Sequence, residues 1–360
     1  MKKKMGMVLT AILSISLLSA CGNAATTNSA KETSAPKQSE AAKPADNASG
    51  SKQKYAIIFK NTGNPYGEKQ MEGFKNAITE LGGEPILKAP DQPTAEAQIK
   101  MIEELISQKV ASIAIVGNDP DALQPALKKA MNAGIKVLSL DSAVNAKSRL
   151  VHINQADPER IGRVQVQAIS EMIGGKGEIA VLSATSQATN QNTWIEWMKE
   201  ELKDPKYKDI KLVKVAYGDD LRDKSVSETE ALLKSFPNLK GIIAPTTVGI
   251  AAAGKVLTDK GLKDKVQLTG LGLPSEMAQY IETGVSKWMF LWNPIDVGYL
   301  AGYTADALVK GTITGKEGEK FKAGRLGDKS IVKDGDGTQI MLGDPFKFDA
   351  SNIAEWKKVY

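Results

Sequence analysis

From Tyr55 onward, short runs of β-forming residues alternate with amphipathic segments, and this alternation limits the folds that the chain can adopt. The expected strands are Tyr55–Lys60, Pro85–Lys88, Ser112–Val116, Lys136–Asp141, Glu178–Ser183, Lys211–Tyr217, Gly241–Pro245, Val266–Gly270 and Val285–Trp292. The expected helices include Tyr66–Leu81, Ala95–Gln108, Pro120–Ala133, Pro158–Ile173, Thr193–Leu202, Ser225–Ser235, Val248–Lys260, Ser275–Glu282 and Val297–Lys310. Strict β-α alternation predicts parallel sheets covered by helices on both faces. We therefore expect an α/β fold of two doubly wound parallel-sheet lobes.

The residues that end the expected helices, and the composition of two expected strands, support the same fold. Glycines stand where helices should stop, as helix C-terminal glycines do; they are Gly82, Gly83, Gly134, Gly174, Gly175 and Gly261. The runs 113–116 and 179–182 are apolar without alternation, which is typical of strands buried on both faces. The strands are therefore expected in sheet centres.

The order of the segments predicts how the lobes share the chain. We expect an N-terminal lobe from residues 55–155 plus about 291–330, and a C-terminal lobe from residues 156–290 plus about 331–360. A chain that completes one lobe, completes another and then returns crosses between them several times. Such crossovers form a hinge over a cleft.

The first 54 residues differ in kind from the rest. Three lysines, Lys2 to Lys4, precede an apolar run that ends in Leu-Ser-Ala-Cys at Cys21. A charged start, an apolar centre and small residues before a cut are typical of a signal peptide, here 1–20. Cys21 would then be a lipidated N-terminus, followed by a flexible polar tether over 21–54. An uncleaved anchor helix is the alternative, but the apolar run is short for a membrane span of roughly 20 residues.

Composition excludes several function classes. Cys21 is the one cysteine, so no intrachain disulfide, cysteine metal site or catalytic thiol is available to the mature fold. The formal net charge of +5 falls to +2 when residues 1–20, with three lysines and no acid, are removed. A charge this small, on a chain with 42% hydrophobic residues, indicates an ordinary globular protein and no nucleic-acid partner.

Polar residues follow the ends of several expected strands. Open parallel sheets bind ligands outside the carboxyl ends of their strands, so we expect these residues to meet at one cleft. Among the residues at these strand ends are Lys60, Asp141, Asn190, Gln191, Pro245 and Thr247, with Tyr66 and Trp292 as candidate apolar walls. Singly, each has another explanation: Asp141 as a turn residue, Thr247 as a helix cap, Lys60 as a solvated charge, the aromatics as core.

The chemistry of this set suits a small, neutral, polyhydroxylated ligand. A carboxylate accepts from hydroxyls, a lysine donates to oxygen, and Asn and Gln do both, so hydroxyl orientation can be recognised. Aromatic faces suit the C–H side of a sugar-like ring. No metal and no cofactor is expected.

Longer motifs resemble a known family over nearly the whole chain beyond the tether. They are Asn154-Gln155, residues 188–192 (ATNQN), residues 244–250 (APTTVGI), residues 291–294 (LWNP) and residues 342–346 (LGDPF). These resemble the type I periplasmic binding proteins, the extracytoplasmic receptors of ABC importers, and within them the rhamnose receptors and the autoinducer-2 receptors called LsrB. The resemblance implies a monomeric lipoprotein that captures its ligand by hinge closure and delivers it to an ABC permease.

The resemblance leaves two candidate ligands, autoinducer-2 and L-rhamnose. The autoinducer-2 pocket would map onto Lys60, Asp141, Asn190, Gln191, Pro245 and Thr247, and we place autoinducer-2, a quorum-sensing signal, first, with L-rhamnose or another monosaccharide nearly level. Asn190 and Thr247 depart from the autoinducer-2 pattern, which usually has Asp and Ala there, and they also fit the rhamnose group. Gly67 stands where both groups tend to carry a second aromatic residue, so one stacking wall is expected to be missing.

Other function classes are less well supported. An enzyme would need a nucleophile–base pair, and none can be assembled around the one histidine, His152, which we expect in a strand. The run Asp334-Gly335-Asp336-Gly337 lacks the later ligands of a calcium loop and reads as a tight turn. A repressor of related fold would need a DNA-binding segment where the export signal stands. A receptor that passes its ligand to a chemoreceptor remains a further alternative.

Overall fold

The computed structural model describes residues 52–360. The expected signal peptide, Cys21 and all but the last residues of the expected tether lie outside the described residues. The ordered fold begins at Lys54, the first residue of strand β1.

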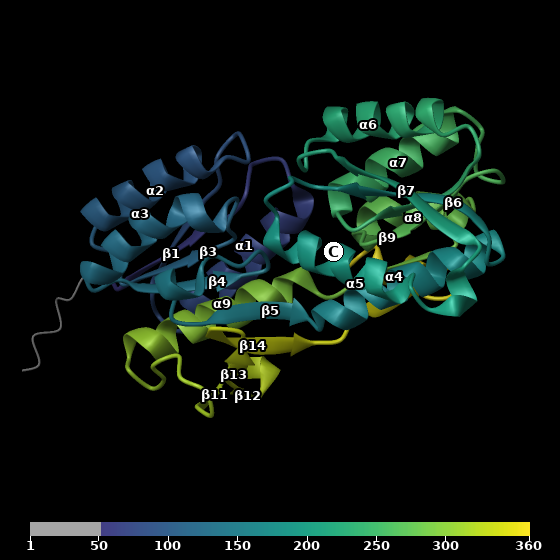
Figure 1. Ribbon diagram of the computed structural model, residues 1–360. Coiled ribbons are helices and arrows are strands. Elements are labelled where there is room, and N and C mark those ends of the chain that lie inside the picture. Colours follow the sequence, from purple (N-terminus) through teal and green to yellow (C-terminus); the bar gives the residue numbers. More distant parts are fainter. Residues whose placement is uncertain (1–51) are drawn as a thin grey trace, which may run out of the picture. The chain divides into compact units, whose positions relative to one another are not determined.

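The first lobe is built on a seven-stranded sheet in the order β13-β14-β5-β4-β3-β1-β2, with helices on both faces (Figure 1). Neighbouring strands pair in parallel, apart from the antiparallel hairpin β13–β14. The elements are β1 (Lys54–Ile58), α1 (Pro65–Glu80), β2 (Glu84–Lys88), α2 (Ala95–Ser107), β3 (Ser112–Ile115), α3 (Pro120–Asn132), β4 (Lys136–Leu140), β5 (His152–Ala156), α9 (Pro294–Val309), β13 (Val332–Asp334) and β14 (Gly337–Gly343). Ile57 packs on the α1 and α9 side and Ile58 on the α2 and α3 side, as pleating requires.

The second lobe has a parallel four-stranded sheet in the order β7-β6-β8-β9. Two isolated parallel bridges, Leu268 to Ser286 and Leu271 to Phe290, continue it to the segment of β10, which pairs antiparallel with β15. The elements are α4 (Pro158–Ile173), β6 (Gly177–Ser183), α5 (Thr189–Glu201), β7 (Ile210–Tyr217), α6 (Arg222–Ser235), β8 (Leu239–Ala244), α7 (Thr247–Asp259), β9 (Gln267–Gly270), α8 (Pro274–Glu282), β10 (Trp288–Leu291), β15 (Phe346–Asp349) and α10 (Ile353–Trp356). Short pieces elsewhere are β11 (Lys320–Lys322), β12 (Asp328–Ser330) and the 3-10 turns Ala146–Ser148, Pro205–Tyr207 and Gly324–Leu326. The expected α/β class with parallel sheets is confirmed.

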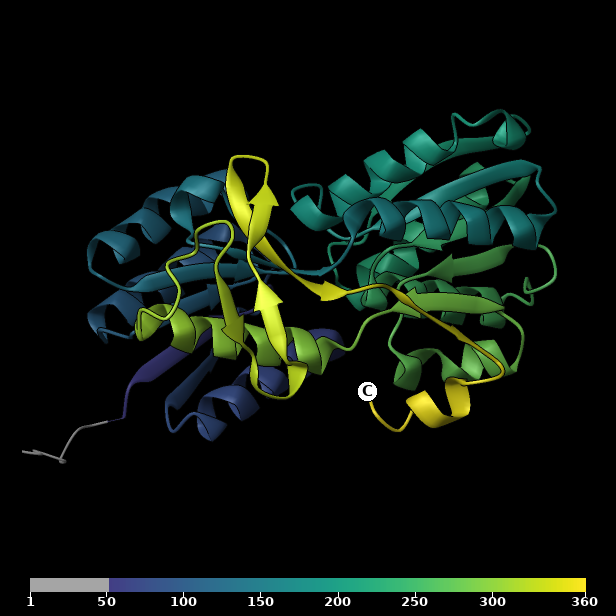
Figure 2. The same ribbon diagram turned by 90° about the horizontal axis from the view of Figure 1, so that it is seen from below.

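Three crossovers join the lobes, after β5, after β10 and after β14 (Figure 2). The expected division of the C-terminal segment is wrong for residues 331–343. Strand β14 pairs in parallel with β5, so this part of the chain completes the first sheet, and only β15 and α10 return to the second lobe. The pairing joins residues 187 positions apart in the sequence, such as His152 and Gln339, and has no local signal.

Two glycines set the spacing between α1 and α9. A Cβ on Gly73 would lie 1.9 Å from the carbonyl oxygen of Ile295, and a Cβ on Gly298 would lie 1.8 Å from that of Gln70. These contacts are far inside van der Waals range, so the two backbones approach closely only because both residues lack a side chain. The close packing fixes the start of α1, which carries Tyr66 and Gln70.

Most boundaries agree with the sequence predictions within a few residues, but α5 begins earlier than expected. Thr189, Asn190 and Gln191 form its first turn instead of a preceding loop. The residue before the helix, Ala188, has no capping side chain, so the usual start signal is missing. The expected helix-ending glycines have positive φ, apart from Gly83.

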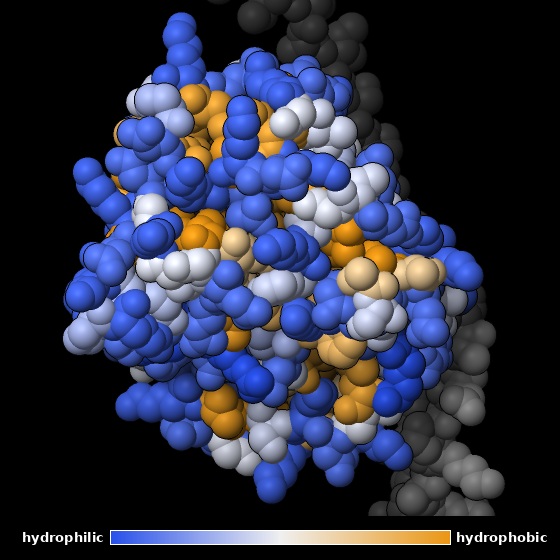
Figure 3. All heavy atoms as spheres, turned by 90° about the vertical axis from the view of Figure 1, so that its right-hand side faces the viewer, coloured by the Kyte–Doolittle hydropathy of each residue, from blue (hydrophilic) through white to orange (hydrophobic). Residues whose placement is uncertain are grey.

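The outer face of the second lobe carries hydrophobic residues in small patches separated by hydrophilic ones (Figure 3). Among residues 52–360, none of the helices has the length and apolar character needed to cross a membrane.

Candidate functional site

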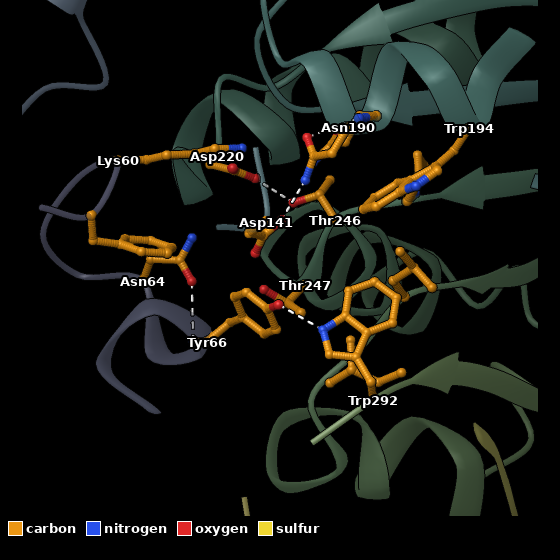
Figure 4. Close-up of a pocket in the computed structure, with 15 residues that line it drawn as sticks. Lys60, Asn64, Tyr66, Asp141, Asn190, Trp194, Asp220, Thr246, Thr247 and Trp292 are labelled. Carbon is orange, nitrogen blue, oxygen red and sulfur yellow. Dashed lines mark hydrogen bonds between the residues drawn. The ribbon is translucent and has the colours of Figure 1, made fainter. Parts of the chain in front are cut away.

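A pocket lies between the lobes, at the carboxyl ends of strands from both sheets (Figure 4). It encloses about 370 Å³ of space between atoms, open solvent at its mouth included. Its lining residues are Phe59, Lys60, Asn64, Tyr66, Asp141, Asn190, Gln191, Trp194, Asp220, Pro245, Thr246, Thr247, Leu271, Leu291 and Trp292.

All eight residues predicted from the sequence line this pocket. Lys60, only 6% exposed, is no solvated surface charge, and Thr247 is the first residue of α7, one position after its N-cap Thr246. The structure therefore brings the predicted set together; that the set binds a ligand remains a prediction.

Asp141 is the most constrained residue of the pocket. It follows β4 with a φ of 59°, a left-handed conformation that few residues other than glycine, asparagine and aspartate adopt. Its Oδ2 accepts from Gln70 Nε2 at 2.9 Å, and its Oδ1 accepts from Gln155 Nε2 at 3.3 Å and from Asn190 Nδ2. Strain of this kind persists where surrounding structure enforces it, and it is common at binding sites.

Keeping the Asp141 carboxylate ionised in its buried position costs free energy. Burial raises the pKa of this carboxyl, and the positive charge of Lys60 and the hydrogen bonds from neighbouring side chains offset only part of that effect. A buried carboxylate with lone pairs still to fill is suited to accepting hydroxyl groups of a ligand.

Aromatic side chains form the apolar part of the wall. Trp292 Nε1 donates to the Tyr66 hydroxyl at 2.7 Å, and Gln70 Nε2 donates to the same oxygen at 2.9 Å. The Trp194 ring packs against Trp292 with 5.8 Å between centroids. Burial, followed by the charge of Asp141, raises the pKa of Tyr66 well above its usual range, so its hydroxyl is neutral. Fixed, uncharged rings are suited to the C–H faces of a sugar.

The space beside Gly67, in α1, is filled by Phe59, which follows β1. A Cβ on Gly67 would lie 2.2 Å from Cε1 of Phe59, so the Phe59 ring occupies the space of any side chain at position 67. Phe59 lines the pocket directly after β1. As expected, position 67 carries no aromatic side chain, and the ring of Phe59 provides apolar surface to the pocket beside it.

The second lobe contributes two helix N-termini to the pocket, those of α5 and α7. Gln191, in the first turn of α5, accepts from Ser183 Oγ and from the Ala184 backbone N–H, both at 2.7 Å. These bonds fix its side chain and leave its amide N–H groups as donors for a ligand. Asn190, beside it, donates to Asp141 of the first lobe, and the positive end of the α5 dipole favours a carboxylate there.

Sequence reasoning missed Asp220. This residue lines the pocket, has a φ of 54° and accepts a hydrogen bond from the hydroxyl of Thr246. The signal was present, since Gly218-Asp219-Asp220 follows strand β7 in the same way that Asp141 follows β4. Asn64, Trp194 and Leu271 were also missed.

The pocket therefore offers two carboxylates, one lysine, several neutral amides and hydroxyls, and aromatic walls. Within residues 52–360, no group of acidic, histidine or cysteine side chains is arranged to hold a metal ion. His152 lies in β5, as predicted, with its Nδ1 2.9 Å from Ser139 Oγ. Residues 334–337 close the β13–β14 hairpin, as predicted for a tight turn.

Comparisons with known proteins agree with this geometry. A family described as "Periplasmic binding protein domain" matches residues 55–313. A solute-binding protein of an ABC transporter from Clostridium phytofermentas, solved with L-rhamnose, is 52% identical, covers 86% of this chain and 99% of its own, and superposes with a TM-score of 0.85.

More distant relatives share the fold. LsrB from Clostridium saccharobutylicum, in complex with autoinducer-2, is 22% identical, with a TM-score of 0.79 over 84% of this chain and 99% of its own. A D-apiose import binding protein from Actinobacillus succinogenes is 24% identical over 77% of this chain and 89% of its own length.

Proposed function

The chain belongs to the periplasmic binding protein family, type I, and we propose that it captures a neutral monosaccharide, with L-rhamnose as the first candidate. Members of this family are extracytoplasmic sugar receptors of ABC transporters and not enzymes. Sugar binding is therefore the starting point, and the choice of sugar is the proposal.

One observation carries the proposal: a single pocket between the lobes combines hydroxyl acceptors and donors with fixed aromatic rings. Asp141 and Asp220 accept from hydroxyls, Gln191 and Lys60 donate to ring or hydroxyl oxygens. Tyr66, Trp292 and Phe59 match the C–H faces that remain.

L-Rhamnose fits this combination of polar groups and apolar surface better than autoinducer-2. A 6-deoxyhexose carries a methyl group besides its hydroxyls, and the rings of Phe59 and Trp292 with Leu271 and Leu291 provide apolar surface for it. The 52% identical relative was solved with L-rhamnose, whereas LsrB is too distant to support more than the fold. The order of preference taken from the sequence alone is therefore reversed, and autoinducer-2 becomes the second candidate.

Hinge closure is the proposed mechanism. Hydrogen bonds already join the lobes at one side of the pocket: Asn190 to Asp141, and Thr189 Oγ1 to the Ala143 carbonyl at 3.0 Å. A sugar that contacts both walls favours the closed arrangement because it gains contacts there that the open one lacks. The permease would recognise that arrangement.

The location and state of the protein follow from the sequence pattern. We propose that residues 1–20 are removed on export, that Cys21 is lipidated and that residues 22–54 tether a monomeric receptor to the membrane. Globomycin, which blocks lipoprotein signal cleavage, tests this: the precursor should accumulate, and a Cys21→Ser variant should be insensitive to the drug.

Isothermal titration calorimetry tests the ligand assignment. Purified protein is titrated with L-rhamnose, autoinducer-2, D-ribose and D-xylose. We expect a saturable heat with L-rhamnose and at least tenfold weaker binding of the others, because a lost hydroxyl contact leaves a buried polar group unpaired. Heat with autoinducer-2 and none with L-rhamnose would overturn the assignment.

A further inference from the structure

A second hollow adjoins the sugar pocket and shares part of its wall. Asp141, Asn190 and Trp194 line both spaces. The hollow holds about 430 Å³, mouth included, so it is comparable in size to the pocket itself. It is bordered by β5 and the β13–β14 hairpin of the first lobe and by the start of α5 in the second.

The partition between the two spaces is thin. It contains the hydrogen bond from Asn190 Nδ2 to Asp141 Oδ1, which joins one lobe to the other. A ligand hydroxyl that binds either side chain competes for this bond. Where the ligand takes its place, the link between the lobes passes through the ligand, and a group attached to the bound sugar can extend from the pocket into the hollow.

The walls of the hollow are suited to hydroxyl groups. His152 Nδ1 lies 2.9 Å from Ser139 Oγ, which leaves Nε2 for a ligand. Asn154 donates through Nδ2 to Gln339, which leaves its carbonyl oxygen. Thr193 donates to the Thr189 carbonyl at 2.9 Å, and its hydroxyl oxygen still has acceptor capacity.

The charge of the hollow excludes anionic groups. No lysine or arginine lines it, while Asp141 and Asp334 do. The carboxylate of Asp334 lies 3.1 Å from Arg149 Nη2, so its charge is paired. A phosphate or carboxylate on the ligand would find no cation in the lining, whereas a neutral hydroxylated group would find both donors and acceptors.

We propose that the protein takes a glycosidically linked ligand, with one sugar ring in the pocket and a second neutral sugar unit in the side hollow. Trp194, 2% exposed and common to both linings, provides one aromatic surface beside the linkage. The inference rests on the proposed function and extends it from a monosaccharide to a disaccharide or glycoside.

Calorimetry with L-rhamnose and the three α-linked L-rhamnosyl-L-rhamnoses, joined through O2, O3 or O4, tests this inference. We expect at least one disaccharide to bind at least tenfold more tightly than free L-rhamnose. Thr193→Trp, at an exposed position on α5, fills the hollow and should abolish that gain while leaving L-rhamnose affinity within about threefold. Thr193→Ser keeps the hollow open and should retain the gain.

The outcomes separate the two proposals. Binding of L-rhamnose without tighter binding of any disaccharide would overturn this inference and leave the proposed function standing. Equal losses for both ligands in Thr193→Trp would overturn it as well, because the hollow would then not be distinguished from the pocket. Binding of none of these sugars would overturn the proposed function itself.

Discussion

The two lobes place an aspartate at the same kind of position, but they hold it differently. Asp141 and Asp220 each follow a parallel strand in a left-handed backbone conformation and line the same pocket. Asp141 accepts from two amides of its own lobe, Gln70 and Gln155, and from Asn190 of the other, whereas Asp220 accepts from one hydroxyl, that of Thr246. The carboxylate of the first lobe is thus held in a preorganised hydrogen-bond network, whereas the carboxylate of the second lobe has fewer hydrogen bonds.

This difference has a functional meaning. A carboxylate fixed before the ligand arrives costs little ordering entropy on binding, so Asp141 should contribute more affinity than Asp220. The second-lobe groups, on the opposite side of the hinge, contribute chiefly when the lobes close.

The largest expected effect is that of Asp141→Ala. Removal of the carboxylate deletes its charge-assisted bonds to the ligand and should lower L-rhamnose affinity by about 10³-fold or more. Calorimetry measures the loss, and circular dichroism checks that the variant is folded. Normal affinity would show that the binding site lies elsewhere.

Asp220→Asn should weaken binding less, by about 10- to 30-fold, because this second-lobe carboxylate is held by fewer hydrogen bonds and only one acceptor is lost. The neighbour Asp219 is a matched control, since it has a φ of 55° but does not line the pocket. Asp219→Asn should leave affinity unchanged. A loss for Asp220→Asn as large as that for Asp141→Ala would remove the contrast between the walls.

Gly67→Ala tests how rigid the first-lobe wall is. The added Cβ meets the Phe59 ring, which is buried and lines the pocket. Overpacking should lower the free energy of unfolding by about 1–3 kcal/mol and push the ring into the pocket, with about tenfold weaker binding. In Phe59→Leu the same substitution should cost less, which a double-mutant cycle measures. Strictly additive effects would contradict the contact.

The smallest effect concerns stability and pH. Burial raises the pKa of Asp141, so the folded state is penalised when this group is charged, and its contribution is most favourable at acid pH and lost as pH rises through the raised pKa. Asp141→Asn removes this titration. Its melting temperature relative to wild type should therefore be higher at pH 8 than at pH 4, by differential scanning fluorimetry. A difference independent of pH would contradict the assigned cause.

Much of this could be predicted from local sequence. Alternating β and α segments and helix-ending glycines were sufficient for the fold class, and polar strand ends together with the family resemblance were sufficient for eight residues of one pocket. Strand β14 could not be placed, because its partner β5 is remote in sequence. Phe59 was not predicted because an aromatic residue at the end of a buried strand is typical of a core, and only its contact with Gly67 and its place in the pocket lining show its second role.

The start of α5 shows a different limit. Asn190 and Gln191 were expected in a loop, and the structure places them in a helix that begins without a side-chain cap. The backbone N–H groups at such a start have no partner within the helix, and here Asn190 Oδ1 accepts one of them, from Gln191, while Asn190 Nδ2 donates to the first-lobe carboxylate. A position that binds a partner can therefore lack the local signal that usually marks its structure.

The central claim is that both walls close on one ligand. In a Cys21→Ser background, Lys128→Cys on α3 and Ser227→Cys on α6 place spin labels on exposed sites of the two lobes. Pulsed electron paramagnetic resonance then measures the distance between them with and without L-rhamnose. The account predicts that saturating L-rhamnose shifts the distribution to one narrow population, and that Asp141→Ala abolishes the shift. An unchanged distribution despite measured binding would contradict it.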